Sequence, residues 1–221
     1  MSAKVLSHGP SRSFPSGYAE LEAAAAAGGG LIVLGAEAGR SWAEIAAVDD
    51  HGFIAIELGT ECLAVHTGLE ASHRGERTVG FARFRMGEAA PTKLVELVRQ
   101  PWTRNEAVAE AKSVFEAAGF VVAVCGDFPG RIVDRLIRPY LNAVLRRLDE
   151  QLASAADLDA TLCKGLGYPE GPIALLNRTG LAHHFDVTEV LHQALGGSDF
   201  LPARRARVAK SRAWLESQRG N

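Results

Sequence analysis

Cysteine, long apolar runs and an excess of charge of one sign are all scarce in this sequence of 221 residues. The three cysteines, Cys62, Cys125 and Cys163, are odd in number, far apart and outside any zinc-ligand spacing, so neither disulfides nor a metal ion are expected. No stretch reaches the roughly 18 consecutive apolar residues of a membrane helix, and no secretory signal is expected at the N-terminus. The 24 basic and 26 acidic residues give a formal net charge of -2, which predicts neither nucleic acid nor a membrane as a partner. These absences predict a cytoplasmic globular protein.

The first half of the sequence alternates between short apolar segments and segments rich in helix formers. Residues 1–19 are rich in Gly, Pro and Ser, which predicts a flexible arm. Strands are expected at 31–34, 53–58, 78–84, 94–98 and 120–125, and helices at 20–27, 41–48 and 105–118. This alternation predicts an α/β layer of parallel strands over residues 20–126.

The second half, residues 127–221, has the pattern of helices alone. Apolar residues recur at helical spacing from 131 to 148, which predicts a long core helix that Pro139 bends. Further helices are expected at 154–164, from 173, at 186–195 and at 203–216, with a structural glycine and proline turn at 165–172. The predicted fold class is therefore α/β followed by all-α, with the division near Gly126.

Three motifs resemble those of the 3-hydroxyacyl-CoA dehydrogenase family, in the family's order and spacing. They are Lys93-Leu-Val-Glu-Leu, Cys125-Gly-Asp-Phe-Pro-Gly-Arg-Ile-Val-Asp-Arg-Leu and Gly165-Leu-Gly-Tyr-Pro-Glu-Gly-Pro. The resemblance implies a truncated Rossmann-like sheet followed by the family's helical C-terminal domain, which forms a homodimer. It also implies NAD-linked oxidation at C3 of an acyl-CoA in fatty-acid or related catabolism.

The resemblance places candidate site residues at four positions. Glu96 falls where the family keeps the Glu that orients its catalytic His, so Glu96 is the catalytic candidate. Glu61 falls in the family's serine-rich substrate-contacting motif, and Asp134 replaces the family's Asn near the start of the long helix. Arg131 replaces the family's usual Phe, and its guanidinium could bind a CoA phosphate. Glu61, Asp134 and Arg131 are therefore the candidate substrate-binding residues.

Two features of the family are missing from this sequence. The position of the catalytic His falls at Ala82, whose methyl group cannot accept a proton. The Gly-x-Gly-x-x-Gly that holds a dinucleotide after the first strand has no counterpart, because the glycines at 28–30 and 35–39 have the wrong spacing or number. We therefore expect the isolated chain to be impaired in hydride transfer and not to bind NAD in the family's usual way.

These observations leave three readings open. One is a shortened dehydrogenase, active through another route or through a partner dehydrogenase chain that supplies the missing parts. The second is a non-catalytic acyl-CoA-binding or dimerisation subunit. The third is a different reaction on an acyl-CoA through Glu61, Cys62 or Asp134, which the sequence permits without favouring it.

Overall fold

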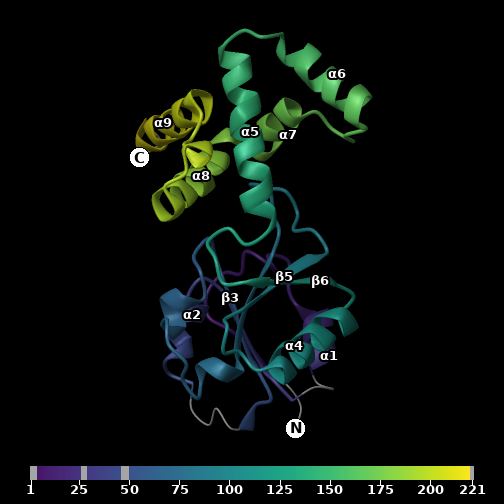
Figure 1. The fold of residues 1–221 in the computed structure, drawn as a ribbon, viewed down its shortest axis with the longest axis vertical. Helices are drawn as coiled ribbons and strands as arrows, with labels where there is room; N and C mark the ends of the chain where they lie inside the picture. The colour runs from purple at the N-terminus through teal and green to yellow at the C-terminus, as the bar shows by residue number, and fades with distance from the viewer. Residues whose placement is uncertain (1–3, 26–28, 46–49, 220–221) are drawn as a thin grey trace. The chain divides into compact units, whose positions relative to one another are not determined.

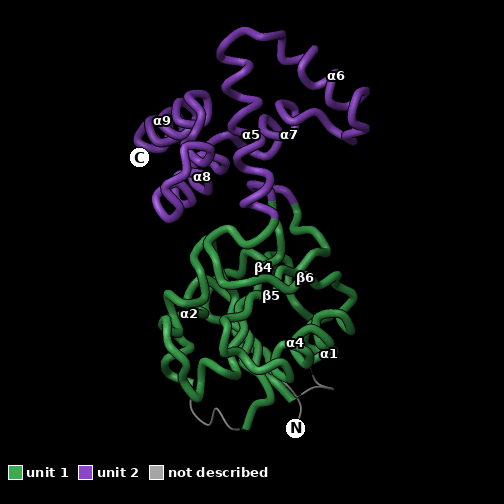
Figure 2. The backbone as a smooth tube through the Cα atoms, viewed as in Figure 1, with its two compact units in different colours: residues 1–85, 90–132 green, residues 86–89, 133–221 purple. Residues whose placement is uncertain are grey.

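The computed structural model describes residues 4–25, 29–45 and 50–219, which form two compact units (Figure 2). Unit 1 comprises residues 1–85 and 90–132, and unit 2 comprises residues 86–89 and 133–221. The division predicted from the sequence lies earlier in the chain, near Gly126. Arg131 and Ile132 belong with unit 1 because both donate hydrogen bonds to Glu96.

Unit 1 is built on a six-stranded sheet whose strands lie in the order of the chain. The strands are β1 (Lys4–Ser7), β2 (Leu31–Leu34), β3 (Ile54–Glu57), β4 (Thr78–Arg83), β5 (Leu94–Arg99) and β6 (Val121–Gly126). The predicted class, α/β followed by all-α, is confirmed. The sheet is mostly parallel, as predicted, but β5 departs from the prediction, because it runs antiparallel to β4 while the other neighbouring pairs are parallel. Only residues 84–93 join β4 to β5, and no helix there carries the chain back to the starting edge.

Alternating side chains give the sheet two apolar faces. Ile32, Phe81 and Leu97 pack on the face covered by α1 (Ala19–Ala25) and α4 (Asn105–Ala117). Val33 and Ile56 face the other way, toward α2 (Ala38–Trp42). Between β3 and β4 the chain forms α3 (Ala64–Thr67) and the 3-10 turn Gly75–Arg77. Figure 1 shows α1 beside α4 and α2 on the opposite face.

The first two crossovers of the sheet have opposite hands. β1, β2 and β3 are consecutive parallel neighbours, so both crossovers advance in the same direction across the sheet. Their helices α1 and α2 nevertheless lie on opposite faces. One of the two connections is therefore left-handed, which is rare for a parallel crossover.

The strand β1 lies inside the arm that the sequence predicts to be flexible. Its backbone pairs with β2, and the amides of Lys4 and His8 donate to Gly30 O at 2.9 Å and Leu34 O at 2.8 Å. The four residues of β1 are too few to show the alternating pattern of a strand, and the Gly, Pro and Ser residues after them are typical of turns. The helices expected at 20–27 and 41–48 are found in part, as α1 and α2, and residues 26–28 and 46–49 lie outside the described residues.

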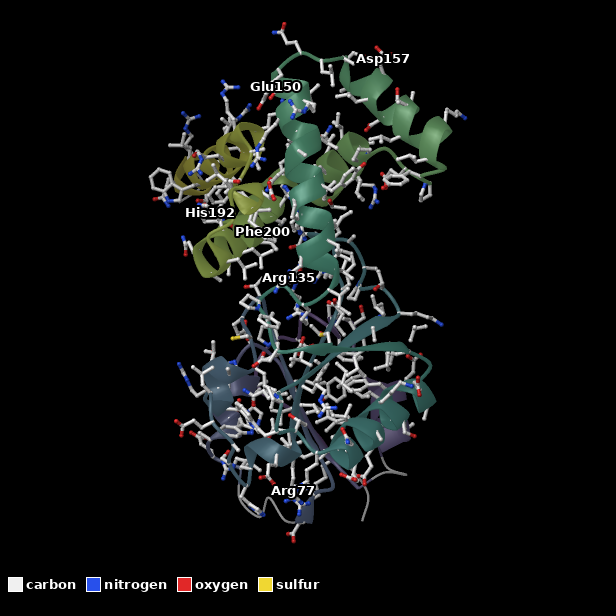
Figure 3. The ribbon with its side chains drawn as sticks, viewed as in Figure 1. Arg77, Arg135, Glu150, Asp157, His192 and Phe200 are labelled. Carbon is white, nitrogen blue, oxygen red and sulfur yellow. The ribbon has the colours of Figure 1, made fainter. Side chains whose placement is uncertain are left out.

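The described residues of unit 2 form helices joined by turns, with no strand among them, as predicted. Its helices are α5 (Val133–Asp149), α6 (Ala155–Leu166), α7 (Pro172–Thr179), α8 (Leu181–Leu195) and α9 (Arg204–Arg219), with a 3-10 turn η3 (Ser198–Phe200). The helix α5 continues through Pro139, and α7, α8 and α9 pack on it (Figure 1). Near the end of α8, His192 Nδ1 lies 3.0 Å from Gly197 O, which fixes the turn toward Phe200 (Figure 3). None of the helices in the described part of the chain is long and apolar enough to span a membrane.

Candidate active site

Glu96 lies in the middle of β5, where its side chain is 1% exposed. In the antiparallel β4–β5 pair, the residue directly opposite Glu96 is Ala82. Side chains opposite one another in such a pair have Cβ atoms about 5 Å apart, which is within reach of a hydrogen bond between longer side chains. Ala82, which stands where the family has its His, is therefore the position from which a longer side chain would reach Glu96.

Arg131 holds the carboxylate of Glu96. Its Nε lies 3.3 Å from Glu96 Oε2, and the backbone amide of Ile132 donates to Glu96 Oε1 at 2.8 Å. Nη1 of Arg131 donates to Gly59 O at 2.9 Å, so the guanidinium also ties Glu96 to the loop after β3. The backbone of Arg131 has φ +50°, which is uncommon for a residue with a side chain. The backbone conformation of Arg131 and its hydrogen bonds to Glu96 and Gly59 place the guanidinium against the candidate catalytic carboxylate.

The thiol of Cys125 lies in the same electrostatic environment, at the end of β6. Burial raises the pKa of Cys125 to about 11, and the negative charge of Glu96 adds to this effect while Arg131 opposes it. Because the thiolate is the reactive form, Cys125 is a poor nucleophile near neutral pH.

Glu61 is held within the loop that follows β3. Its Oε1 accepts from the Gly59 amide at 2.9 Å and lies 3.4 Å from His66 Nε2. Burial raises the pKa of Glu61, but the hydrogen bonds from His66 and from Gly59 outweigh it, so the pKa is lowered from its usual value. Glu61 is therefore a carboxylate at neutral pH.

No group of three or more His, Cys, Asp or Glu side chains among the described residues is arranged to hold a metal ion.

Asp127 fixes the other end of this loop. Its carboxylate accepts from the amides of Leu63 and Ala64, at 2.5 and 2.8 Å, at the start of α3. Gln100 donates to the same carboxylate at 3.3 Å. Unit 1 thus brings Glu96 and Arg131 together with the loop that carries Glu61.

Asp134, the remaining candidate, belongs to unit 2 and takes part in a buried polar network. Its Oδ1 accepts from Arg138 Nε at 2.7 Å, and Arg138 is 1% exposed. Nη1 of Arg138 lies 3.1 Å from His184 Nδ1, and His184 Nε2 lies 3.0 Å from Asn142 Oδ1. An arginine can only donate, so Nδ1 accepts and the proton of the imidazole is on Nε2.

This network holds His184 in its neutral form. Burial lowers the pKa of His184 to about 3, and the positive charge of Arg138 contributes to the shift. The network was not predicted from the sequence, because Arg138 and His184 lie 46 residues apart. The spacing of Asp134 and Arg138, one helical turn apart, is the signal that would have pointed to their pairing.

The C-terminal part of the chain matches a known domain. A model described as "3-hydroxyacyl-CoA dehydrogenase, C-terminal domain" matches residues 130–220. The chain is similar to the 3-hydroxyacyl-CoA dehydrogenase family in this C-terminal domain. It is 29% identical over 161 residues to the probable 3-hydroxybutyryl-CoA dehydrogenase of Bacillus subtilis (strain 168), covering 73% of this chain and 55% of that protein.

Two further proteins are similar to this chain in sequence or in fold. The mitochondrial hydroxyacyl-coenzyme A dehydrogenase of Homo sapiens is 32% identical over 143 residues, which are 61% of this chain and 45% of that protein. The crystal structure of (S)-3-hydroxybutyryl-CoA dehydrogenase from Ralstonia eutropha shares the fold, with a TM-score of 0.70 and 22% identity over 88% of this chain and 68% of that one. The chain spans about half the length of the curated relatives that it matches.

Proposed function

We propose that this chain is an acyl-CoA-binding subunit of the 3-hydroxyacyl-CoA dehydrogenase family that does not itself carry out NAD-linked oxidation at C3. The observation that carries the proposal is the pairing of Ala82 with Glu96, whose carboxylate Arg131 holds. Oxidation of a hydroxyl at C3 requires a group that accepts the hydroxyl proton as hydride leaves. A methyl group cannot accept it.

The neighbouring residues do not replace the missing base. Arg131 has only donors and remains protonated. Glu96 is buried, and both of its oxygens accept hydrogen bonds from residues 131 and 132. In this arrangement Glu96 holds residues 131 and 132 of unit 1 rather than orienting an imidazole.

Binding of an acyl-CoA is supported by the names of the relatives, which are hydroxyacyl-CoA dehydrogenases. Arg131, Glu61 and Asp134 are the proposed contact residues in this chain. The proposal includes a homodimer through unit 2, a role in acyl-CoA catabolism, and association with a partner dehydrogenase chain.

A shortened but active dehydrogenase is the alternative, and the similarity to the family favours it. The deciding experiment measures NADH oxidation with acetoacetyl-CoA, together with calorimetric binding of acetoacetyl-CoA without NADH. The variants are Glu96→Gln, Ala82→His and, as a matched control, Glu70→Gln, which changes an exposed carboxylate of the same unit.

We expect acetoacetyl-CoA to bind, the wild type to show no turnover, and Ala82→His to remain inactive because Arg131 still holds Glu96. Turnover in the wild type that Glu96→Gln abolishes and Glu70→Gln preserves would establish the shortened dehydrogenase instead. Absence of both turnover and binding would overturn acyl-CoA binding and favour a dimerisation subunit.

A further inference from the structure

Residues 8–14, here called the strap, lie at the edge of the sheet where cofactors bind in related architectures. Open α/β sheets hold their ligands outside the carboxyl ends of the parallel strands, where the strand order reverses. In unit 1 the described strands β1 to β4 follow one another without a reversal. The chain that leaves β1 at Ser7 bonds in turn to the segment that follows β2 and to the last residues of β3 and β4.

The first contacts of the strap are with the residues that follow β2. The amide of Glu37 donates to His8 O at 3.1 Å, and the amide of Ala36 donates to Pro10 O at 3.2 Å. Between them, Gly35 has φ +102°, and a Cβ added to it would lie 2.3 Å from His8 O. The strap therefore passes so close to the end of β2 that only glycine fits there.

Glu57, the last residue of β3, joins the strap to β2. Its Oε1 accepts from the Ser13 amide at 2.7 Å and its Oε2 accepts from the Gly35 amide at 2.7 Å. The residue is 6% exposed. Backbone amides bind phosphate oxygens through the same kind of short hydrogen bond that they donate here to a buried carboxylate.

The strap ends on β4 and in the core. The amide of Arg83 donates to Ser13 Oγ at 3.1 Å, and Arg83 Nη1 donates to Ser13 O at 2.8 Å. Phe14 is 6% exposed and packs edge-on against Phe81 and Phe120, with ring centroids 6.5 and 5.7 Å apart. This burial anchors the strap in place.

The helix that follows the strap is also unsuited to a phosphate. In a dinucleotide-binding sheet, the first helix begins directly after the glycine turn and its free amides face the pyrophosphate. Here α1 begins only at Ala19, and its first turn carries Glu20 and Glu22. Two carboxylates at that helix start repel an anion.

We infer that the strap and Glu57 fill the crevice that a dinucleotide-binding sheet leaves open for its cofactor, with the Glu57 carboxylate taking the amides that an anionic ligand would use. The residues present do not fit NAD, and unit 1 is closed to it. This inference is independent of the missing base at Ala82, because a chain without a base can still bind NAD.

The first test uses the wild-type chain. We expect no NADH binding tighter than about 1 mM by calorimetry. We also expect slow hydrogen exchange at the Ser13 and Gly35 amides that NADH does not change. Micromolar binding of NADH, with added protection over residues 8–14 and 35–37, would overturn the inference even if the chain shows no turnover.

The second test removes the carboxylate that accepts from the Ser13 and Gly35 amides. In Glu57→Ala, the Ser13 and Gly35 amides lose their acceptor, so inorganic phosphate should raise the melting temperature of this variant and leave that of the wild type and of Glu70→Gln unchanged. Equal responses of the variant and the controls would overturn the role of Glu57 as a substitute anion. If Glu57→Ala does not fold, Glu57→Gln serves, because its amide nitrogen cannot accept from the second backbone N–H.

Discussion

Arg131 and Glu96 form a buried ion pair whose side chains are 7% and 1% exposed, with Nε 3.3 Å from the carboxylate. Removing one partner of such a pair leaves an uncompensated charge, which costs about 3–5 kcal/mol. We therefore expect Arg131→Met to lower the free energy of unfolding by about that amount. The substitution leaves the strain of the φ +50° backbone unchanged, because Met, like Arg, carries a Cβ.

Urea denaturation measures this effect, and the double variant Arg131→Met with Glu96→Gln is its control. Most of the lost stability should return in the double variant, since it contains no buried unpaired charge. A double variant as unstable as the sum of the two single variants would show that the pair is not coupled.

The thiol of Cys125 should react slowly with iodoacetamide. A pKa of about 11 leaves about one thiol in a thousand ionised at pH 8. In a variant with Cys62→Ser and Cys163→Ser, alkylation followed by mass spectrometry reports Cys125 alone. Adding Glu96→Gln removes a charge that raises the pKa of Cys125, so the reaction should become faster. Alkylation at the rate of an exposed cysteine would contradict the assignment.

His184 should make the stability of unit 2 depend on pH in a known direction. The pKa of His184 is about 3 in the folded chain, and the ordinary value is 6.5. Between these values the unfolded chain binds a proton that the folded chain does not, so stability falls as the pH falls. Its contribution is complete above about pH 6.5 and decreases by up to about 1.4 kcal/mol per pH unit below it.

Urea denaturation between about pH 6 and pH 4 tests this dependence. His184→Gln removes the titrating group and should give a shallower slope than the wild type. His183→Gln is the matched control, because the side chain of His183 is 43% exposed and adjacent in the sequence. Equal slopes in His184→Gln and the wild type would rule out this histidine as the source.

Asp159 and Gly171 should act as a unit. The carboxylate of Asp159 accepts from the amides of Ile173 and Ala174 at 2.8 and 2.9 Å, at the start of α7. Asp159→Ala should cost about 1 kcal/mol, as for other helix caps. A Cβ on Gly171 would lie 2.2 Å from Cγ of Asp159, so Gly171→Ala should displace the same cap.

Denaturation of both single variants and of the double variant measures the coupling between these two residues. We expect the double variant to lose less stability than the sum of the single losses, because the clash exists only while Asp159 is present. Strict additivity would show that a side chain at Gly171 does not act through Asp159.

The features that could be predicted from the sequence are the ones encoded locally. The apolar runs at 31–34 and 94–98 became β2 and β5, and the stripe after Arg131 became α5. The family motif also identified Ala82 as the position that lacks the His, and in the structure Ala82 lies opposite Glu96. For these features, neighbouring residues carry the information.

The features that escaped prediction depend on contacts between residues far apart in the sequence. The bonds of Ser13 to Arg83 join positions 70 residues apart, and nothing in the Gly, Pro and Ser composition of residues 8–17 encodes them. Arg138 and His184 meet across 46 residues, so each looks like an ordinary surface residue when the sequence is read alone. Likewise, the antiparallel direction of β5 follows from the absence of a crossover helix rather than from any residue within the strand.

The strand order of unit 1 also bears on how the protein assembles during synthesis. Since β1 to β6 pair in the order in which they are translated, each strand meets the one already in place, and the sheet can lengthen vectorially behind the ribosome. The bonds between Ser13 and Arg83 are different, because they wait until β4 has emerged. We therefore expect the strap to close only after β1, β2 and β3 have paired in a folding time course.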